Sequence, residues 1–251
     1  MEEPHITSED FVRYLERRFD KPRRDFRVGR RVMLSDVAGL PAFIQSLSLV
    51  EAPTRLFRDP YYSRPAAPPV DISVMRGPIG APAAVSVVEE LVALGAQEIW
   101  VLGYCGSLQP HLSYGALLIP NAAHVDEGTS AHDGRTGPSH PNADLLMVLT
   151  GAAPDVPVGA LWTTDAIYRE MPSQIRRYQE QGVLGVDMET SALFHLGHHL
   201  GVPVGALMVV SDELFHAWSP GFGSEAVQEG CSHAYQVMSG ILTRSDRVSC
   251  P

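Results

Sequence analysis

Lysine, cysteine and long apolar runs are all scarce in this sequence. Lysine occurs once, at Lys21, and the three cysteines (Cys105, Cys231 and Cys250) are too few and too scattered for a disulfide framework. No apolar run approaches the roughly 18 residues that a membrane-spanning helix needs. The first residues, MEEPH, lack the basic-then-apolar order of a secretory signal. These absences predict a protein of the reducing cytoplasm that has no membrane contact.

Motifs for nucleotide cofactors and metals are missing as well. The chain has no P-loop and no G-x-G-x-x-G, so neither ATP nor NAD is implied. His195, His198 and His199 have helical spacing, but without the glutamate of an H-E-x-x-H motif they indicate a helix face rather than a zinc site. We therefore expect no metal and no cofactor.

The charge is acidic overall, with one basic cluster. The net charge is −10, which argues against a nucleic-acid partner, yet nine of the 19 basic residues lie between Arg13 and Arg31. This segment is interpreted as a solvated helix face and loop; an anion-attracting rim and a nucleic-acid arm are the alternatives. The acidic balance of the other residues favours the first interpretation.

Short apolar stretches alternate with longer amphipathic ones along the chain, which predicts a mainly parallel sheet covered on both faces. Strands are expected at 31–34, 70–75, 98–103, 116–120, 158–162, 182–186 and 204–211. Helices are expected at 8–18, 41–49, 82–94, 143–150, 172–181, 188–200 and 224–242. The segment 53–70 is expected to be a surface excursion and 124–142 a long polar loop. No repeat or linker is visible, so residues 1–251 are expected to form a single domain.

Polar or small residues directly follow four of the predicted strands. In open parallel sheets ligands bind beyond the carboxyl ends of the strands, so these residues should share one cleft. Such a cleft would hold two or three carboxylates and almost no cation, which favours a neutral, hydroxyl-rich ligand such as a sugar. The four groups are Tyr104-Cys105-Gly106-Ser107, Thr163-Thr164-Asp165, Asp187-Met188-Glu189 and Ser211-Asp212-Glu213.

Two blocks of the sequence make the chain recognisable. GPIGAPAAVSVVEELVALGAQEIWVLGYCGSL, followed by GVDMETSALFHLGHHLGVPVGALMVVSDEL, resembles the nucleoside phosphorylase family, which includes bacterial purine nucleoside and uridine phosphorylases. The resemblance runs from Pro4 to about Leu242. It implies a three-layer α/β/α fold with a central, mainly parallel or mixed twisted sheet, of the phosphorylase/hydrolase-like type. It also implies a homo-oligomer, a hexamer or another dimer-based assembly, that cleaves a small-molecule nucleoside with inorganic phosphate as co-substrate.

The resemblance also assigns the residues that carry the chemistry. Met188 and Glu189 would lie against the ribose, with Glu189 accepting hydrogen bonds from its hydroxyls as positive charge develops on the sugar. Asp187 stands where the family commonly has glutamate. Asp212 would protonate the leaving base at N7, which favours a purine-like base. Ser211 is placed beside it among the substrate-binding residues.

Other correspondences depend on the resemblance alone. Trp162 matches an aromatic residue that stacks on the base, although a core indole is the alternative. His5 matches a residue that reaches a neighbouring subunit's 5′-hydroxyl, although an exposed histidine is the alternative. Arg58 matches a phosphate-binding arginine given to the adjacent subunit. The wall of the base pocket is assigned to Cys105, Gly106 and Val186, and Tyr104 is counted among the substrate-binding residues.

The phosphate site departs from the family pattern. Leu40 and Val101 stand where arginines are expected, Tyr104 replaces a small hydroxyl residue, and no arginine partner for Asp212 is visible around residues 224–225. Phosphate needs several charge-assisted donors. Arg76 is the residue that would compensate. The resemblance predicts phosphorolysis, and the departures at the phosphate site make hydrolysis the alternative. A catalytically silent nucleoside-binding protein is a further alternative.

Overall fold

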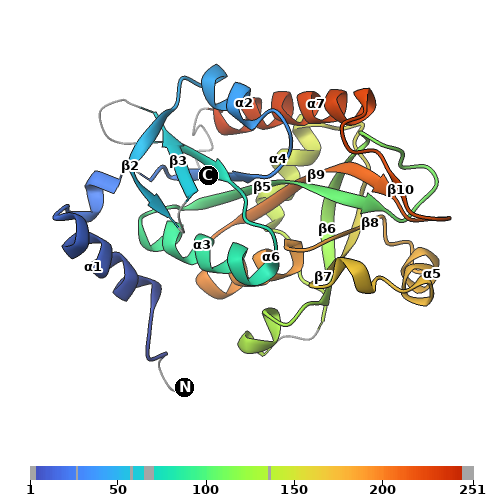
Figure 1. Ribbon diagram of the computed structural model, residues 1–251, viewed down its shortest axis with the longest axis horizontal. Coiled ribbons are helices and arrows are strands. Elements are labelled where there is room, and N and C mark those ends of the chain that lie inside the picture. The colour runs from blue at the N-terminus through green and yellow to red at the C-terminus, as the bar shows by residue number, and fades with distance from the viewer. Residues whose placement is uncertain (1–3, 27, 57–58, 65–70, 135–136, 245–251) are drawn as a thin grey trace, which may run out of the picture.

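The computed structural model describes residues 4–26, 28–56, 59–64, 71–134 and 137–244, and it is shown in Figure 1. The strands are β1 (Arg31–Ser35), β2 (Val50–Leu56), β3 (Asp59–Ser63), β4 (Ile72–Arg76), β5 (Glu98–Ser107), β6 (Leu117–Asp126), β7 (Val158–Thr164), β8 (Gly185–Asp187), β9 (Val204–Glu213) and β10 (Ser219–Pro220). The α-helices are α1 (Ser8–Phe19), α2 (Leu40–Ser46), α3 (Ala81–Ala93), α4 (Ala143–Ala152), α5 (Pro172–Glu180), α6 (Thr190–Leu200) and α7 (Glu225–Leu242). Three 3₁₀ turns complete the described elements: η1 (Arg23–Phe26), η2 (Ser130–Asp133) and η3 (Ile167–Arg169).

The ten strands form one mixed sheet in the order β10-β9-β6-β7-β8-β5-β1-β4-β3-β2. The pairs β1–β4, β1–β5, β5–β9, β6–β7 and β7–β8 are parallel, and the remaining pairs are antiparallel. Because β9 also pairs with β5, the strands β5, β8, β7, β6 and β9 close into a ring. The predicted α/β fold with a mixed central sheet is confirmed, and the ring is an additional feature.

Helices cover both faces of the sheet and bury two large apolar clusters. One cluster joins α1, α3 and α6 to the sheet through residues such as Leu15, Leu91 and Leu193. The other joins α2, α4 and α7 through residues such as Phe43 and Leu149. Figure 1 shows α2 and α7 along one side of the sheet and α3 and α6 on the opposite side. In the described part of the chain, no helix is long and apolar enough to cross a membrane.

The segment 53–70 was expected to be a surface excursion, but its described part contains the end of β2 and all of β3. Strand β3 pairs antiparallel with β4, and Tyr61 is fully buried against the core. The prolines at positions 53 and 60 concealed this hairpin in the sequence, since proline is tolerated in outer strands but weakens a strand signal. The expected polar loop 124–142 likewise begins inside β6, which extends to Asp126.

The basic cluster between Arg13 and Arg31 lies mostly on α1 and in the turn after it. Arg13 pairs with Asp10 at 2.6 Å and Arg23 pairs with Glu9 at 2.5 Å, and all four side chains are well exposed. Exposed ion pairs of this kind contribute little to stability. They neutralise part of the cluster locally, which supports the interpretation as a solvated face.

Two long-range contacts tie the end of the described chain to its central strands. Arg31 Nη1, at the start of β1, donates to the carbonyl oxygen of Leu242 at 3.0 Å, across 211 positions of sequence. Arg244 Nη2 donates to both carboxylate oxygens of Glu98, at the start of β5, at 2.8 and 2.9 Å. Helix α7 is therefore fastened across β1 and β5.

The parallel pairing of β5 with β9 contains one irregularity. Cys105 lies opposite Val210, whereas Gly106 lies opposite Asp212, so Ser211 is an extra residue on β9. In a regular strand Ser211 would occupy the position beside Gly106. The bulge brings the Asp212 carboxylate there instead.

Candidate active site

A cavity of about 1030 Å³ opens where β5, β8 and β9 end. Its walls are completed by the segment between β7 and α5 and by the hairpin that follows β9. Polar residues after the strands meet here because the carboxyl ends of β5 and β9 point to the same edge. The cavity is lined by nine of the residues predicted from sequence: Tyr104, Cys105, Gly106, Val186, Asp187, Met188, Glu189, Ser211 and Asp212.

Glu189 lies at the start of α6 and is held by the backbone of another element. The Gly80 N–H, at the start of α3, donates to Glu189 Oε1 at 2.5 Å. Burial, together with the negative charge of Asp187, raises the pKa of Glu189 to about 8, although the Gly80 bond opposes this rise. In the unliganded protein the Glu189 carboxyl is therefore largely protonated at neutral pH. A protonated carboxyl can both donate to and accept from a sugar hydroxyl.

Asp187 is buried, and its carboxylate accepts hydrogen bonds from backbone N–H groups at the start of α6. Its Oδ1 accepts from Thr163 Oγ1 at 2.6 Å, and its Oδ2 accepts the N–H groups of Thr190 at 2.8 Å and Glu189 at 3.3 Å. Burial raises the pKa of Asp187, while these hydrogen bonds act against that rise. The shorter aspartate thus caps the helix that carries Glu189.

Asp36 is a carboxylate of the cavity that the sequence reasoning missed. It directly follows β1, and burial, reinforced by the charge of Asp187, raises its pKa to about 6. Arg76, exposed at the end of β4, lowers the pKa of Asp36 through its positive charge but does not itself line the cavity. The signal was available, because Asp36 follows a predicted strand in the same way as the four groups that were recognised.

Tyr104 occupies the region where the family pattern places a small hydroxyl residue. Its hydroxyl accepts the Ala38 N–H at 2.9 Å and lies 3.4 Å from Cys231 Sγ. Burial raises the pKa of Tyr104 to about 12, so the group stays a neutral phenol. The Ala38 N–H, in the loop after β1, already donates to the Tyr104 hydroxyl and is therefore not available to bind an anion.

Asp212 carries a hydrogen bond on each carboxylate oxygen. Ser211 Oγ donates to Oδ1 at 2.6 Å, and Trp218 Nε1 donates to Oδ2 at 3.0 Å. Glu170 faces the same end of the cavity, where burial, with the charge of Asp212 added, raises the pKa of Glu170 to about 7. Burial, followed by nearby negative charge, also raises the pKa of Cys105, which keeps this thiol neutral and excludes an activated nucleophile.

Gly106 contributes open space beside the Asp212 carboxylate. A Cβ at this position would lie 2.3 Å from Leu214 Cδ1 and 3.3 Å from Asp212 Oδ2. The missing side chain lets β5 approach the loop after β9 closely. Space beside the Asp212 carboxylate is kept open as a result.

Trp162 lies elsewhere, which corrects the expectation that it stacks on a base. It is 1% exposed, stacks on Tyr178 with ring centroids 4.7 Å apart, and donates from Nε1 to Asp126 Oδ2 at 2.9 Å. Because β7 continues to Thr164, Trp162 lies within the strand and packs toward α5. Apolar and aromatic residues that do line the cavity include Ile167, Tyr168, Phe215, Trp218 and Phe222.

Of the remaining predicted residues, His5 is exposed and lies apart from the cavity lining, and Arg58 falls outside the described residues. Leu40 begins α2, and Val101 is buried within β5. Arg176, on α5, is a cationic side chain among the lining residues. It was not predicted, because it lies on a helix rather than after a strand.

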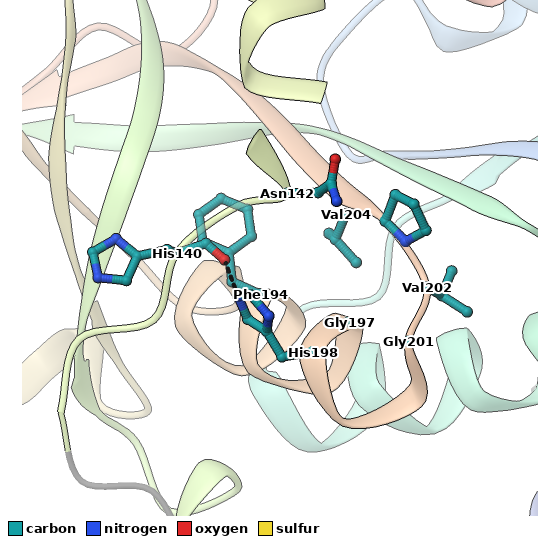
Figure 2. Close-up of a pocket in the computed structure, with 9 residues that line it drawn as sticks. His140, Asn142, Phe194, Gly197, His198, Gly201, Val202 and Val204 are labelled. Atoms are coloured by element: carbon teal, nitrogen blue, oxygen red, sulfur yellow. Dashed lines mark hydrogen bonds between the residues drawn. The ribbon is translucent and has the colours of Figure 1, made fainter. Parts of the chain in front are cut away.

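A second, smaller cavity of about 180 Å³ lies near the start of β9, and Figure 2 shows its lining. The imidazole of His198 is 3.1 Å from the carbonyl oxygen of His140 through Nε2, and the Asn142 side-chain oxygen caps α4. These polar groups bond within the protein. Among the described residues, no group of three or more His, Cys, Asp or Glu side chains could hold a metal ion.

Comparison with known proteins places this architecture in a family. Residues 51–245 match the model of the phosphorylase superfamily. The chain belongs to the phosphorylase superfamily. Its fold is also that of solved phosphorylase structures: a uridine phosphorylase from Vibrio fischeri ES114 superposes with a TM-score of 0.73 at 22% identity, covering 85% of this chain and 91% of that one.

Sequence relatives within the superfamily match over part of their length. Guanosine phosphorylase from Halorubrum lacusprofundi is 31% identical over 149 residues, which cover 57% of this chain and 62% of the relative. A DeoD-type purine nucleoside phosphorylase from Buchnera aphidicola is 28% identical over 150 residues, covering 57% of this chain and 63% of the relative. The matched segments therefore span less than two thirds of either relative.

Proposed function

We propose that the protein cleaves the N-glycosidic bond of a purine-like nucleoside by phosphorolysis, releasing the free base and a pentose 1-phosphate. The observation that carries this proposal is that Glu189 and Asp212 open into one cavity from two different strand ends. One carboxyl is suited to sugar hydroxyls, and the other is suited to a leaving base. The relatives named as guanosine and purine nucleoside phosphorylases support the same substrate class.

The sugar would lie against Met188 and Glu189. Hydrogen bonds donated by the sugar hydroxyls favour the ionised form of Glu189, so the bound substrate would shift this carboxyl toward its carboxylate. As the C1′–N bond lengthens, positive charge grows on the sugar, and the carboxylate bonded to its hydroxyls stabilises that charge. Glu189 is fixed for this task by the Gly80 N–H and by the helix start that Asp187 caps. Buried, pre-oriented groups of this kind need no reorganisation during the reaction.

The base would leave toward Asp212. The electron pair of the C1′–N bond passes to the base, Asp212 gives its proton to a base nitrogen, and the attacking oxygen forms the new bond at C1′. The retention of an acid at this position is the feature that opposes a purely binding role, because binding alone needs no proton donor. Ser211, Cys105, Gly106 and Val186 form the adjoining wall.

Hydrolysis is the second candidate, and a specific observation favours it. Tyr104 uses the Ala38 amide, and Leu40 and Val101 stand where arginines are expected, so the chain supplies few donors to a phosphate dianion. Arg58 and Arg76 are the cationic residues that phosphorolysis would depend on. Water needs no cationic partner.

We also propose that the protein acts as a dimer-based homo-oligomer, a hexamer by resemblance. His5 and Arg58 would then serve a neighbouring subunit's site. Two large apolar side chains of the cavity lining are highly exposed in the single chain: Ile79 is 69% exposed and Tyr168 is 88% exposed. Exposed apolar surface of this kind supports a contact with another subunit.

The deciding experiment is product analysis of a nucleoside panel in phosphate-free buffer, followed by titration with phosphate. Strict phosphate dependence with a pentose 1-phosphate product is the expected result. Release of free pentose without phosphate would replace phosphorolysis with hydrolysis. Binding without cleavage of any nucleoside would leave only a binding role.

A further inference from the structure

Trp218 is placed by the hairpin that follows Asp212. After β9 the chain turns back, so that β10 pairs antiparallel with the end of β9, with Pro220 opposite Asp212. The Gly221 N–H donates to the carbonyl oxygen of Ser211 at 3.0 Å, and the Ser219 hydroxyl bonds to that of Tyr114. Trp218 directly precedes β10, so this backbone pairing sets its position relative to the carboxylate.

The side chain of Trp218 is held by its N–H group rather than by burial. It is 65% exposed, yet its Nε1 donates to Asp212 Oδ2 at 3.0 Å. An indole N–H is a donor only, so Asp212 Oδ2 is the acceptor in this contact. With the Ser211 hydroxyl on the other oxygen, both oxygens of Asp212 are held and its plane is fixed.

We propose that Trp218 is a positioning residue for the cleavage reaction, holding the Asp212 carboxyl toward the leaving base and stabilising it once its proton is given away. This inference rests on the proposed function. When Asp212 transfers its proton to the base, the electron pair of the O–H bond stays on the carboxyl group. The Trp218 N–H and the Ser211 O–H then bond to a charged acceptor, and such hydrogen bonds are stronger than those to a neutral one. Trp218 thus promotes proton transfer without contacting the reacting atoms.

Glu170 lines the same cavity as Asp212, and the negative charge of Asp212 contributes to the raised pKa of Glu170. A neutral donor such as the indole stabilises the Asp212 carboxylate without bringing a counter-ion into the site.

The kinetic test compares Trp218→Phe with wild type on two substrates. One is an unmodified purine nucleoside; the other is its 7-methylated form, whose base leaves without needing a proton. We expect a loss in kcat/KM of about tenfold on the first and less than about twofold on the second, since one charge-assisted bond is removed. Phe222→Leu, at the same cavity mouth but without a bond to Asp212, should affect both substrates equally. In an Asp212→Asn background, Trp218→Phe should cause no further loss.

A second measurement tests the contact without any substrate. Each of the three indole N–H groups donates to a carboxylate: Trp100 to Glu98, Trp162 to Asp126 and Trp218 to Asp212. In protein labelled with ¹⁵N-tryptophan, the signal lost in Trp218→Phe identifies Trp218. Asp212→Asn should shift that signal and leave the signals of the two buried indoles in place.

The outcomes separate this inference from the function on which it rests. An unshifted Trp218 signal, equal losses on the two substrates, or additive losses in the double variant would each overturn the role of Trp218 alone. Failure of the wild-type protein to cleave either nucleoside would overturn the proposed function, and the positioning role of Trp218 with it.

Discussion

Replacing Glu189 with glutamine should make the protein more stable at alkaline pH. Burial beside other carboxylates raises the pKa of Glu189 from the ordinary 4.5 to about 8. Between these values the folded protein retains a proton that the unfolded chain has lost, so folding stability falls as the pH rises from 4.5 to about 8. Glutamine keeps the acceptor for the Gly80 N–H but carries no charge at any pH.

The size of the effect follows from the same numbers. A pKa rise from 4.5 to about 8, at about 1.36 kcal/mol per pH unit, corresponds to an upper limit of about 5 kcal/mol. Water entering the open cavity solvates part of the charge, so we expect Glu189→Gln to raise the free energy of unfolding by about 2–3 kcal/mol at pH 8.5. At pH 5, where Glu189 is protonated in the folded protein, the difference should be close to zero.

Urea unfolding at a series of pH values, at constant ionic strength, measures this difference directly. Glu180→Gln is the matched control: Glu180 is exposed on α5, and its replacement should leave the curve parallel to that of wild type. Parallel curves for Glu189→Gln and wild type would refute the reasoning, because they would mean that Glu189 is ionised in the folded protein at neutral pH. A loss of stability at all pH values would do the same.

Three further outcomes follow from the site. Glu189→Gln, although more stable, should lose at least about 100-fold in kcat/KM for nucleoside cleavage, as removal of one strong transition-state contact does, and activity within threefold of wild type would remove Glu189 from the site. Asp212→Asn should impair cleavage of an unmodified purine nucleoside much more than that of its 7-methylated form, and equal losses would make Asp212 structural. Light scattering at working concentration should give a dimer or larger assembly, and an active monomer would deprive His5 and Arg58 of their proposed roles.

The elements of the fold were largely predictable, because each carries its own local signal. The helix at 81–93 is bracketed by Pro82 at its first turn and Gly95 after its end, and the strand at 98–107 contains a continuous apolar run directly after Glu98. The closure of β5, β8, β7, β6 and β9 into a ring was not predictable, since it depends on which distant strands pair. The β2–β3 hairpin was missed for a local reason, because its prolines weaken the strand pattern.

The residues that line the candidate site were predictable where they directly follow strands. Asp187, Met188, Glu189 and Asp212 were found by that rule, and Asp36 would have been found by applying it once more. Trp162 was misplaced because β7 runs beyond it, which turns a residue expected at the cavity into a core residue. Trp218 belongs to a loop that is positioned by the antiparallel pairing of β10 with the end of β9. No periodicity in the sequence predicts that pairing.

The long-range contacts of the fold also constrain how the chain can fold during synthesis. Strand β5 pairs over most of its length with residues 204–213 of β9. The carbonyl oxygen that accepts from Arg31 belongs to Leu242, 211 positions after Arg31. While the ribosome has produced only the residues up to α6, most of one apolar edge of β5 has no partner, and such edges invite aggregation. Helix α7 must then be synthesised before it can pack on its face of the sheet. Chains truncated before β9 are therefore expected to aggregate rather than to persist as folded, active forms.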